Sequence, residues 1–279
     1  MIPTTFDYLR PATLDEALIA LATREDPKVL AGGHSIIPAM KLRLAQPKTV
    51  IDISRITELA QIREQDGKIS IGAMVTHFQI ESSELLAEKC ALLPETAAQI
   101  GDVQVRNRGT IGGSLVHADP AADWPAAMLA LDAEMQIAGA GGRRVIAAKD
   151  FFVEMMQSAV QSNEILAEIR VPVTPKSTAY VKFAQKASGF AIAGVAAVVD
   201  RAKRTVRIGV TGVAPRAYRA AGVESALRGR EISAESIREA AGKASDGIET
   251  LNDIHASAEF RAHLAIVNTR RALELAVSR

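Results

Sequence analysis

The segment from Gln104 to Trp124 constrains this chain more than any other. It reads Q-V-R-N-R-G-T-I-G-G-S-L-V-H-A-D-P-A-A-D-W and concentrates two adjacent glycines, hydroxyls, arginines and acids in an otherwise alanine-rich chain. A shorter version, A-G-G-H-S, lies upstream at 31–35. Paired glycines followed by serine suit a backbone that approaches a bulky anion closely, because no Cβ intervenes and successive N–H groups converge on phosphate oxygens. Two such loops can hold the two phosphates of a dinucleotide.

Neither glycine pair belongs to a common phosphate motif. The chain has no G-x-x-x-x-G-K-[ST], and no G-x-G-x-x-G opens a helix after a strand. A lone Gly-Gly pair is more often a tight turn than a ligand site. The similar run Gly139–Gly142 lies between two strand-like segments, so we expect a hairpin turn there.

Charge and cysteine content exclude several classes of function. With 33 basic and 32 acidic residues, the formal charge is only +1, without the basic excess of a protein that binds nucleic acid or an anionic membrane. The single cysteine, Cys90, excludes an internal disulfide and any cysteine-ligated zinc or iron–sulfur site made by this chain alone. The N-terminus has no secretory pattern and the longest apolar run, 191–199, is too short to span a bilayer. We therefore expect a soluble, cytoplasmic protein with no membrane span.

The order of periodic segments predicts an α+β fold. A capping box at 13–16 starts a first helix, and short strands at 28–30 and 48–53 form a small α/β unit with the first glycine pair at a strand end. A second, larger α/β unit contains a mostly helical stretch at 83–99, broken near Pro94, and a glycine loop at 109–114. Strands are expected at 68–72, 134–138, 143–147 and 164–171, and a helix at 123–131.

Prolines at 172–175 mark the clearest boundary, because they stop regular structure and the pattern changes after them. Three antiparallel strands are then expected at 179–187, 192–200 and 205–212, followed by helices near 218–228, 234–245 and 258–277. The predicted domains are 1–55, 56–175 and 176–279.

Two long motifs carry a resemblance to a known family. The sequences V-L-A-G-G-H-S-I-I-P-A-M-K-L-R-L-A at 29–45 and R-N-R-G-T-I-G-G-S-L-V-H-A-D-P-A-A-D at 106–123 resemble the two signature loops of the FAD-binding medium subunit of molybdenum hydroxylases. That family includes carbon monoxide dehydrogenase and, as a fused domain, xanthine dehydrogenase. The resemblance implies a two-part FAD-binding α/β domain of the PCMH/vanillyl-alcohol-oxidase-like type, followed by a three-stranded antiparallel sheet with a helical bundle.

The resemblance also implies a set of cofactor contacts. Val29 to Ser35 and Thr110 to Ser114 would wrap the FAD pyrophosphate, and Asp123 would bond a hydroxyl of the ribityl or ribose portion. Apolar residues at 100 and 166 match positions that line the flavin, with ordinary core packing as the alternative. The predicted cofactor-binding residues are Val29, Leu30, Ala31, Gly32, Gly33, His34, Ser35, Ile36, Ile100, Thr110, Ile111, Gly112, Gly113, Ser114, Asp123, Leu166, Lys182, Lys186 and Phe190.

Three of these positions leave alternatives open. Either Lys182 or Lys186 occupies the region where relatives place a lysine near the polar edge of the ring, and a surface lysine on a strand is the competing explanation. Phe190 departs from relatives that carry a tyrosine at about this position, because a phenyl ring shields the flavin but donates no hydrogen bond. This departure concerns the reaction of the flavin with its electron acceptor more than FAD binding itself.

Other chemistries find no support in the sequence. His34, His117 and Asp119 match no metal-ligand spacing, and neither Ser35 nor Ser114 lies in a G-x-S-x-G elbow. We therefore predict no metal site and no catalytic acid, base or nucleophile in this chain.

The resemblance implies an FAD-carrying electron-transfer subunit of a heterotrimeric molybdenum hydroxylase. Its expected partners are a small subunit with two [2Fe–2S] clusters and a large molybdopterin subunit, assembled as a dimer of heterotrimers. A self-sufficient flavin oxidoreductase and a non-enzymatic scaffold subunit without flavin are the alternatives. The substrate of the complex and its electron acceptor stay open at this point.

Overall fold

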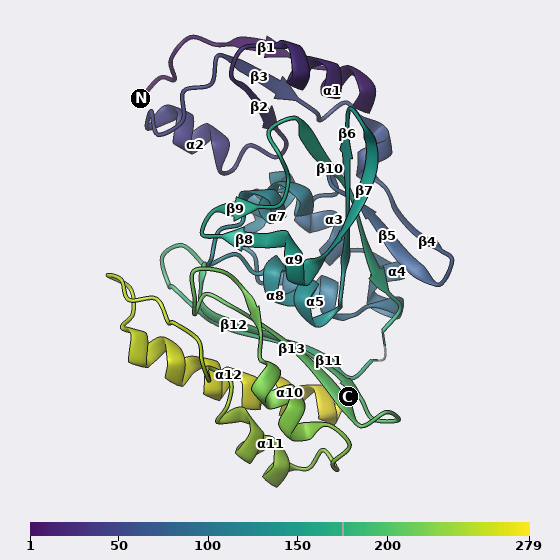
Figure 1. Ribbon diagram of the computed structural model, residues 1–279, viewed down its shortest axis with the longest axis vertical. Coiled ribbons are helices and arrows are strands. Elements are labelled where there is room, and N and C mark those ends of the chain that lie inside the picture. Colours follow the sequence, from purple (N-terminus) through teal and green to yellow (C-terminus); the bar gives the residue numbers. More distant parts are fainter. Residues whose placement is uncertain (175) are drawn as a thin grey trace.

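Three of the four β-sheets follow one another along the long axis of the molecule, and the fourth is a two-stranded sheet beside the middle one (Figure 1). The structure is a computed structural model that describes residues 1–174 and 176–279. Pro175, the last residue of the predicted boundary, lies outside the described residues. The α+β class is confirmed, and the predicted domain limits themselves stay predictions.

The N-terminal unit is a small parallel sheet with two helices. Its strand order is β1-β3-β2, and the sequence analysis missed β1. Helix α1 starts as expected, since the Thr13 side chain accepts from the Glu16 N–H. The Glu16 carboxylate accepts from the Ala12 N–H, one residue before the expected partner. The elements are β1 (Asp7–Leu9), α1 (Leu14–Thr23), β2 (Pro27–Leu30), α2 (Ile36–Lys41) and β3 (Thr49–Asp52).

The central unit is built on a five-stranded antiparallel sheet. Its order is β4-β5-β10-β6-β7, so its middle strand is the last of the five to occur in the chain. The predicted hairpin turn at 139–142 is confirmed, because Gly139 pairs with Gly142 across it. The strands are β4 (Ile62–Gln65), β5 (Lys68–Gly72), β6 (Glu134–Gly139), β7 (Gly142–Ala147) and β10 (Glu164–Pro172).

Short helices cover one face of this sheet and share its core, which includes Ile71, Trp124 and Met135. Helix α1 packs on the other face, where Leu14 joins Ile165 and Ala167. The remaining elements are η1 (Thr57–Ala60), α3 (His77–Glu81), α4 (Glu84–Lys89), α5 (Leu92–Ala98), α6 (Val103–Arg108), α7 (Ile111–His117), α8 (Trp124–Ala130), α9 (Ala148–Phe151), β8 (Phe152–Glu154) and β9 (Gln157–Ser158).

Two expectations for this region need correction. The stretch at 83–99 is mostly helical as expected, but its break lies at Cys90 and Ala91, and Pro94 lies in the first turn of α5, where its missing N–H costs nothing. The expected glycine loop at 109–114 is helical from Ile111 onward. Its two glycines therefore lie in the first turn of α7, which Thr110 caps by accepting from the Gly113 N–H.

The C-terminal unit is an antiparallel sheet of four strands, not three. The order is β11-β12-β13-β14, and its fourth strand is a two-residue segment that was expected to be helical. The elements are β11 (Thr178–Ala184), β12 (Ala191–Asp200), β13 (Thr205–Thr211), β14 (Tyr218–Arg219), α10 (Ala221–Leu227), α11 (Ala234–Ala241) and α12 (Ala258–Ser278).

The continuous apolar run at 191–199 is explained by burial on both faces of β12. Val198 joins the core of the central unit, whereas Val195 and Val199 join the core formed with the C-terminal helices. No helix in the described ranges is long and apolar enough to cross a membrane.

Helix α8 joins the central and C-terminal units, and all seven of its residues are buried. Strand β13 approaches it so closely that a Cβ at Gly209 would lie 2.0 Å from the Ala126 carbonyl oxygen. The C-terminal sheet therefore rests on the backbone of this helix.

Candidate functional site

The first glycine segment connects β2 to α2 and leaves its backbone donors free. Gly33 has a φ of 81°, a conformation that glycine adopts without strain. Within residues 1–174 and 176–279, no hydrogen-bond acceptor is found for the backbone N–H groups of residues 32–36. The Ser35 side chain makes no capping bond to α2, and Ser35 and His34 are both exposed. Five successive N–H groups and a hydroxyl are therefore available to an anion.

The second glycine segment differs, because its own fold uses the backbone donors of residues 111–114. The Ile111 N–H donates to the Val75 carbonyl at 3.0 Å, and the Gly112 N–H donates to the Ala73 carbonyl at 2.9 Å. A Cβ at Gly112 would lie 2.4 Å from the Ala73 Cβ. Gly112 is thus needed for close packing, and what faces outward from this segment is the exposed Gly113 and the partly exposed Ser114.

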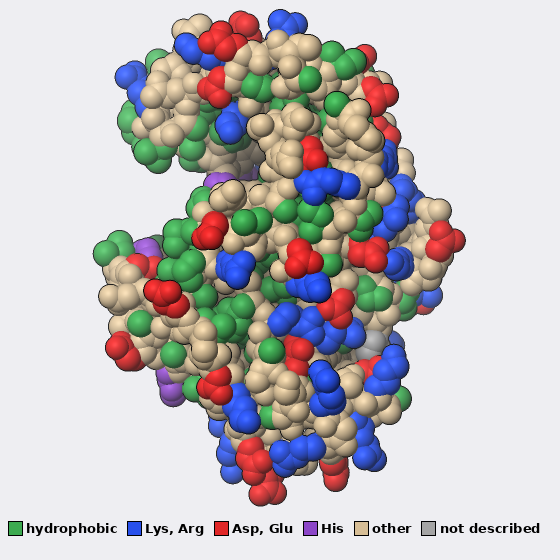
Figure 2. Space-filling view, in the orientation of Figure 1, with side chains coloured by type: hydrophobic (Ala, Val, Ile, Leu, Met, Phe, Trp, Pro, Cys, Tyr) green, Lys and Arg blue, Asp and Glu red, His purple; other side chains and the backbone are tan. Residues whose placement is uncertain are grey.

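The structure brings the two segments together. A Cβ at Gly32 would lie 2.2 Å from the Arg108 carbonyl oxygen, so the two backbones touch where glycine leaves room. A Cβ at Gly113 would lie 3.7 Å from the Ala31 Cβ. The surface is hollowed between the N-terminal unit and the rest of the molecule, with histidine atoms at the inner end of the hollow (Figure 2). Segments about 75 residues apart in sequence therefore form one surface, as two loops around a single pyrophosphate require.

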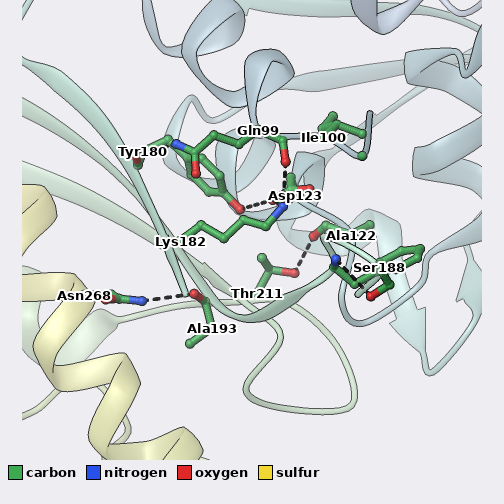
Figure 3. Close-up of polar contacts among 12 residues, drawn as sticks. Gln99, Ile100, Ala122, Asp123, Tyr180, Lys182, Ser188, Ala193, Thr211 and Asn268 are labelled. Carbon is green, nitrogen blue, oxygen red and sulfur yellow. Dashed lines mark hydrogen bonds and ion pairs between the residues drawn. The ribbon is translucent and has the colours of Figure 1, made fainter. Parts of the chain in front are cut away.

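A buried ion pair marks a second cluster, where the central unit meets the C-terminal sheet (Figure 3). The Lys182 Nζ lies 2.9 Å from Asp123 Oδ1 and donates to the Gln99 carbonyl at 2.7 Å. The Tyr180 hydroxyl donates to Asp123 at 2.5 Å. The side chains of Lys182 and Asp123 are only 3% and 5% exposed.

This environment shifts the ionisation of two of the three groups. Burial raises the pKa of Asp123, and the Lys182 ammonium and the Tyr180 hydroxyl counteract that rise. Burial also raises the pKa of Tyr180 well above its usual value, and the Asp123 carboxylate adds to this rise. The phenol therefore stays neutral and donates a hydrogen bond to Asp123. Asp123 precedes α8 but does not cap it, so the role of ordinary helix cap does not apply.

The two candidate lysines have different surroundings. Lys182 is held in the ion pair, whereas Lys186 is exposed in the turn between β11 and β12. This turn lies against the central unit, since a Cβ at Gly189 would lie 3.6 Å from the Gly101 Cα. Phe190, at the end of the turn, is 48% exposed.

The two apolar candidates also differ. Ile100 is partly buried and packs at the edge of the central core, beside the Lys182 cluster (Figure 3). Leu166 is 2% exposed and lies within that core. Core packing therefore accounts for Leu166, and its contact with a flavin stays a prediction.

Helix α6 spans the distance between the two clusters. Its N-terminus follows Ile100 and Gly101, and its C-terminus leads into Gly109. Six residues of helix cover about 9 Å. Arg106 is occupied internally, because it pairs with Glu81 at 2.7 Å and donates to the Ile100 carbonyl at 3.1 Å. Backbone N–H groups left unpaired by the described residues at one end of this stretch and a buried ammonium at the other are the donors that a flavin dinucleotide needs, so the residues present fit FAD.

Two residues of this region escaped the sequence analysis. Tyr180 precedes Lys182 by two positions on a strand, so the two side chains share a face, and that spacing was a usable signal. His77 is a lone histidine at a helix start, and nothing in the sequence connects it with the glycine segments.

Comparison with known proteins covers nearly the whole chain. Residues 4–174 match the family described as FAD binding domain in molybdopterin dehydrogenase, and residues 178–276 match CO dehydrogenase flavoprotein C-terminal domain. The carbon monoxide dehydrogenase medium chain of Hydrogenophaga pseudoflava is 40% identical, with 100% of this chain and 99% of the relative covered. The nicotine 6-hydroxylase medium subunit of Paenarthrobacter nicotinovorans is 35% identical, with 95% of each chain covered. The solved structure of carbon monoxide dehydrogenase from Hydrogenophaga pseudoflava superposes with a TM-score of 0.95 at 40% identity, covering 100% of this chain and 99% of that chain.

Proposed function

Since this chain belongs to the family of FAD-binding medium subunits of molybdenum hydroxylases, we propose that it passes electrons from [2Fe–2S] clusters on a partner subunit to an external acceptor. FAD suits that position when bound, because a flavin accepts electrons singly and releases them as a pair. The protein supplies position and electrostatics, and none of its side chains is needed as a general acid or base.

The observation that carries the proposal is the run of free N–H groups at 32–36 beside the second glycine segment. These donors would bind the pyrophosphate, with hydroxyls from Ser35 and Ser114 on either side. Backbone donors fixed in place suit this role, because they need no reorganisation when the anion arrives.

The second cluster supports a role in orienting the flavin ring. We favour Lys182 over Lys186, because a buried ammonium whose direction is fixed by Asp123 and Gln99 presents a defined positive charge, whereas Lys186 is free in solvent. In the proposal, Ile100 and Phe190 shield the ring and Asp123 lies near a hydroxyl of the chain that links ring and phosphate. The remaining residues predicted from the resemblance keep their proposed roles as contacts to FAD.

In this proposal, other chains hold the [2Fe–2S] clusters and the molybdopterin. Cys90 is fully buried, and burial raises the pKa of its thiol to about 11, so it is not available as an iron ligand. The relatives are themselves called medium chains or medium subunits. We infer a small iron–sulfur subunit and a large molybdopterin subunit, arranged as a dimer of heterotrimers in the cytoplasm.

Calorimetry with the purified chain tests the cofactor. FAD should bind in a 1:1 ratio and at least about tenfold more tightly than FMN, because FMN lacks the second phosphate and the adenosine. Comparable affinities for the two flavins would contradict the proposed pyrophosphate site.

Anaerobic reduction tests the assignment as a subunit. Candidate substrates should not bleach the flavin band of the isolated chain, and they should bleach it after reconstitution with the iron–sulfur and molybdenum subunits. Bleaching of the isolated chain by an organic substrate would instead establish a self-sufficient oxidoreductase. A folded chain that takes up no FAD would be a scaffold.

A further inference from the structure

His77 lies beneath the second glycine segment, at the start of α3. Its side chain is buried, with 4% exposure, and its Nδ1 accepts a hydrogen bond from the Trp124 indole N–H at 3.1 Å. Trp124 is fully buried, and the two ring centroids are 5.9 Å apart. The imidazole is therefore held in one orientation by a hydrogen bond from a fully buried neighbour.

The hydrogen bond to Trp124 also fixes the tautomer of His77. An indole N–H only donates, so Nδ1 must accept and the proton of the neutral ring lies on Nε2. Burial lowers the pKa of His77 to about 4, and the nearby basic groups His34, in the first glycine segment, and Arg106, in α6, lower it slightly further. The ring is thus neutral near pH 7.

Two glycines, Gly109 and Gly32, let the two glycine segments pack closely over this ring. A Cβ at Gly109 would lie 2.7 Å from His77 Nε2 and 2.8 Å from its Cδ2, so the ring edge occupies that space. The backbone N–H of His77 also donates to the Gly109 carbonyl at 2.9 Å. On the opposite side, a Cβ at Gly32 would lie 2.9 Å from the Gly109 Cα. Contacts therefore run in sequence from Trp124 to His77, from His77 to Gly109, and from Gly109 to Gly32.

The same contacts connect the two ends of the site. Trp124 directly follows Asp123, which holds Lys182. A shift of the imidazole would therefore move the Gly109 segment relative to both Gly32 and the start of α8.

We propose that His77 is a positioning residue for FAD, whose ring, locked by Trp124, sets the spacing between the two glycine segments that receive the pyrophosphate. The inference rests on the proposed function, since it assigns a role within the same site. His77 itself touches no reacting atom.

A double-mutant cycle on FAD affinity tests the proposal. His77→Phe and Trp124→Phe should each weaken FAD binding by about tenfold. The double variant should bind FAD at most about threefold more weakly than either single variant, because both changes remove the same interaction. His77→Asn should bind within about threefold of wild type, because its Oδ1 takes the place of Nδ1 and accepts from Trp124. His263→Phe, an exposed histidine of α12, is the matched control and should leave affinity unchanged.

The outcomes separate this inference from the proposed function. If wild type binds FAD and a folded His77→Phe binds it within about twofold, the positioning role is overturned and the proposed function stands. If the wild-type chain binds no FAD, both are overturned. Independent, additive losses in the cycle would also overturn the inference, because the Trp124 bond would then not be the means by which His77 acts.

An acid titration supplies a readout that needs no folded His77→Phe variant. Trp124 is the only tryptophan of the chain, so tryptophan emission reports on this hydrogen bond directly. In wild type, emission should change and FAD should be released together near pH 4, when Nδ1 takes up a proton and stops accepting. His77→Asn should lack this step, since asparagine does not titrate. Identical release midpoints for the two proteins would contradict the proposal.

Discussion

Gly33 and Gly112 are glycines for different physical reasons. Gly33 needs its φ of 81°, in a segment whose N–H groups have no hydrogen-bond acceptor among the described residues. Gly112 has ordinary helical geometry, and its missing side chain lets Ala73 approach. The first glycine shapes the segment proposed to bind the pyrophosphate, and the second permits close packing.

Gly33→Ala should therefore weaken FAD by about tenfold, because forcing an L-residue into this conformation costs about 1–2 kcal/mol and pulls the segment out of shape. Gly67→Ala is the matched control, since Gly67 also has a positive φ, of 70°, and has nothing within 4 Å of its Cβ position in the β4–β5 turn. Both variants should lose some thermal stability, and only Gly33→Ala should lose affinity in a flavin fluorescence titration. Equal FAD affinities for the two would argue against a phosphate site at Gly33.

Asp123→Ala should affect stability more than the loss of one cofactor hydrogen bond. Removing the carboxylate leaves Lys182 buried without its counter-ion, which typically costs about 3–5 kcal/mol, against roughly 0.5–1.5 kcal/mol for one hydrogen bond to a hydroxyl. Urea unfolding of the cofactor-free chain measures this directly. Glu239→Ala, which breaks the exposed Arg230–Glu239 pair, should change the free energy of unfolding by less than about 0.5 kcal/mol.

Acid should destabilise the fold through His77. Between pH 6.5 and about 4, the unfolded chain binds a proton at this residue that the folded chain excludes. The free energy of unfolding therefore decreases as pH falls, and at pH 4 it is about 3 kcal/mol lower than at neutral pH because of this residue. Urea midpoints over this range should fall less steeply for His77→Asn, and equal slopes for both proteins would contradict the assignment.

Among the elements, α8 has the most demanding position, because it packs between two sheets. Its alanines and its early proline give it a thin, closely packed surface, and Gly209 lets β13 rest on its backbone. This contact also fixes the start of the helix, where Asp123 and Trp124 reach the two ends of the site.

Gly209→Ala should push β13 away from α8, since the new methyl would overlap the Ala126 carbonyl. Overpacking of this kind costs about 1–3 kcal/mol or more. The thermal unfolding temperature should fall, and Trp124 emission should shift to the red if the helix start loosens. Gly141→Ala, in the exposed β6–β7 turn with nothing within 4 Å of its Cβ position, should leave both unchanged.

Local pattern predicted most of these elements, because the strands and helices are amphipathic or bounded by turn residues. The first turn of α7 was missed, since its glycines are poor helix formers and the donors that hold them in place are satisfied by Ala73 and Val75 from distant sequence. The short strands β1 and β14 were missed because two or three residues carry no periodicity.

The candidate site was predictable as chemistry and less so as geometry. The glycines, hydroxyls and lysines could be named from the sequence. The sequence did not reveal that the first segment leaves a run of five N–H groups without acceptors among the described residues while the second uses most of its donors, because that depends on which acceptors tertiary packing supplies. The roles of Tyr180 and His77 likewise arise from contacts across 57 and 47 positions.

For the whole molecule, the central unit depends on the C-terminal one. A fragment ending at residue 174 would expose the face of α8 that β12 and β13 cover and would leave Asp123 without Lys182. We expect such a fragment to aggregate or to remain partly unfolded by circular dichroism and size-exclusion chromatography. Adding residues 176–279 in trans should recover solubility if the contact alone is needed. A monomeric, fully folded fragment would show instead that the two units are independent.

The position of β10 in the sheet means that the central sheet can be completed only late in synthesis. This strand lies between β5 and β6, yet residues 73–163 leave the ribosome between β5 and it. Until Pro172 has emerged, β5 and β6 have no partner between them, and their unpaired edges must be shielded by the helices already made. Lys182 emerges later still, so both glycine segments proposed to hold the pyrophosphate are made before the lysine proposed to orient the flavin. Pairing across such long separations is slow, and we therefore expect the complete site to form late in the life of each chain.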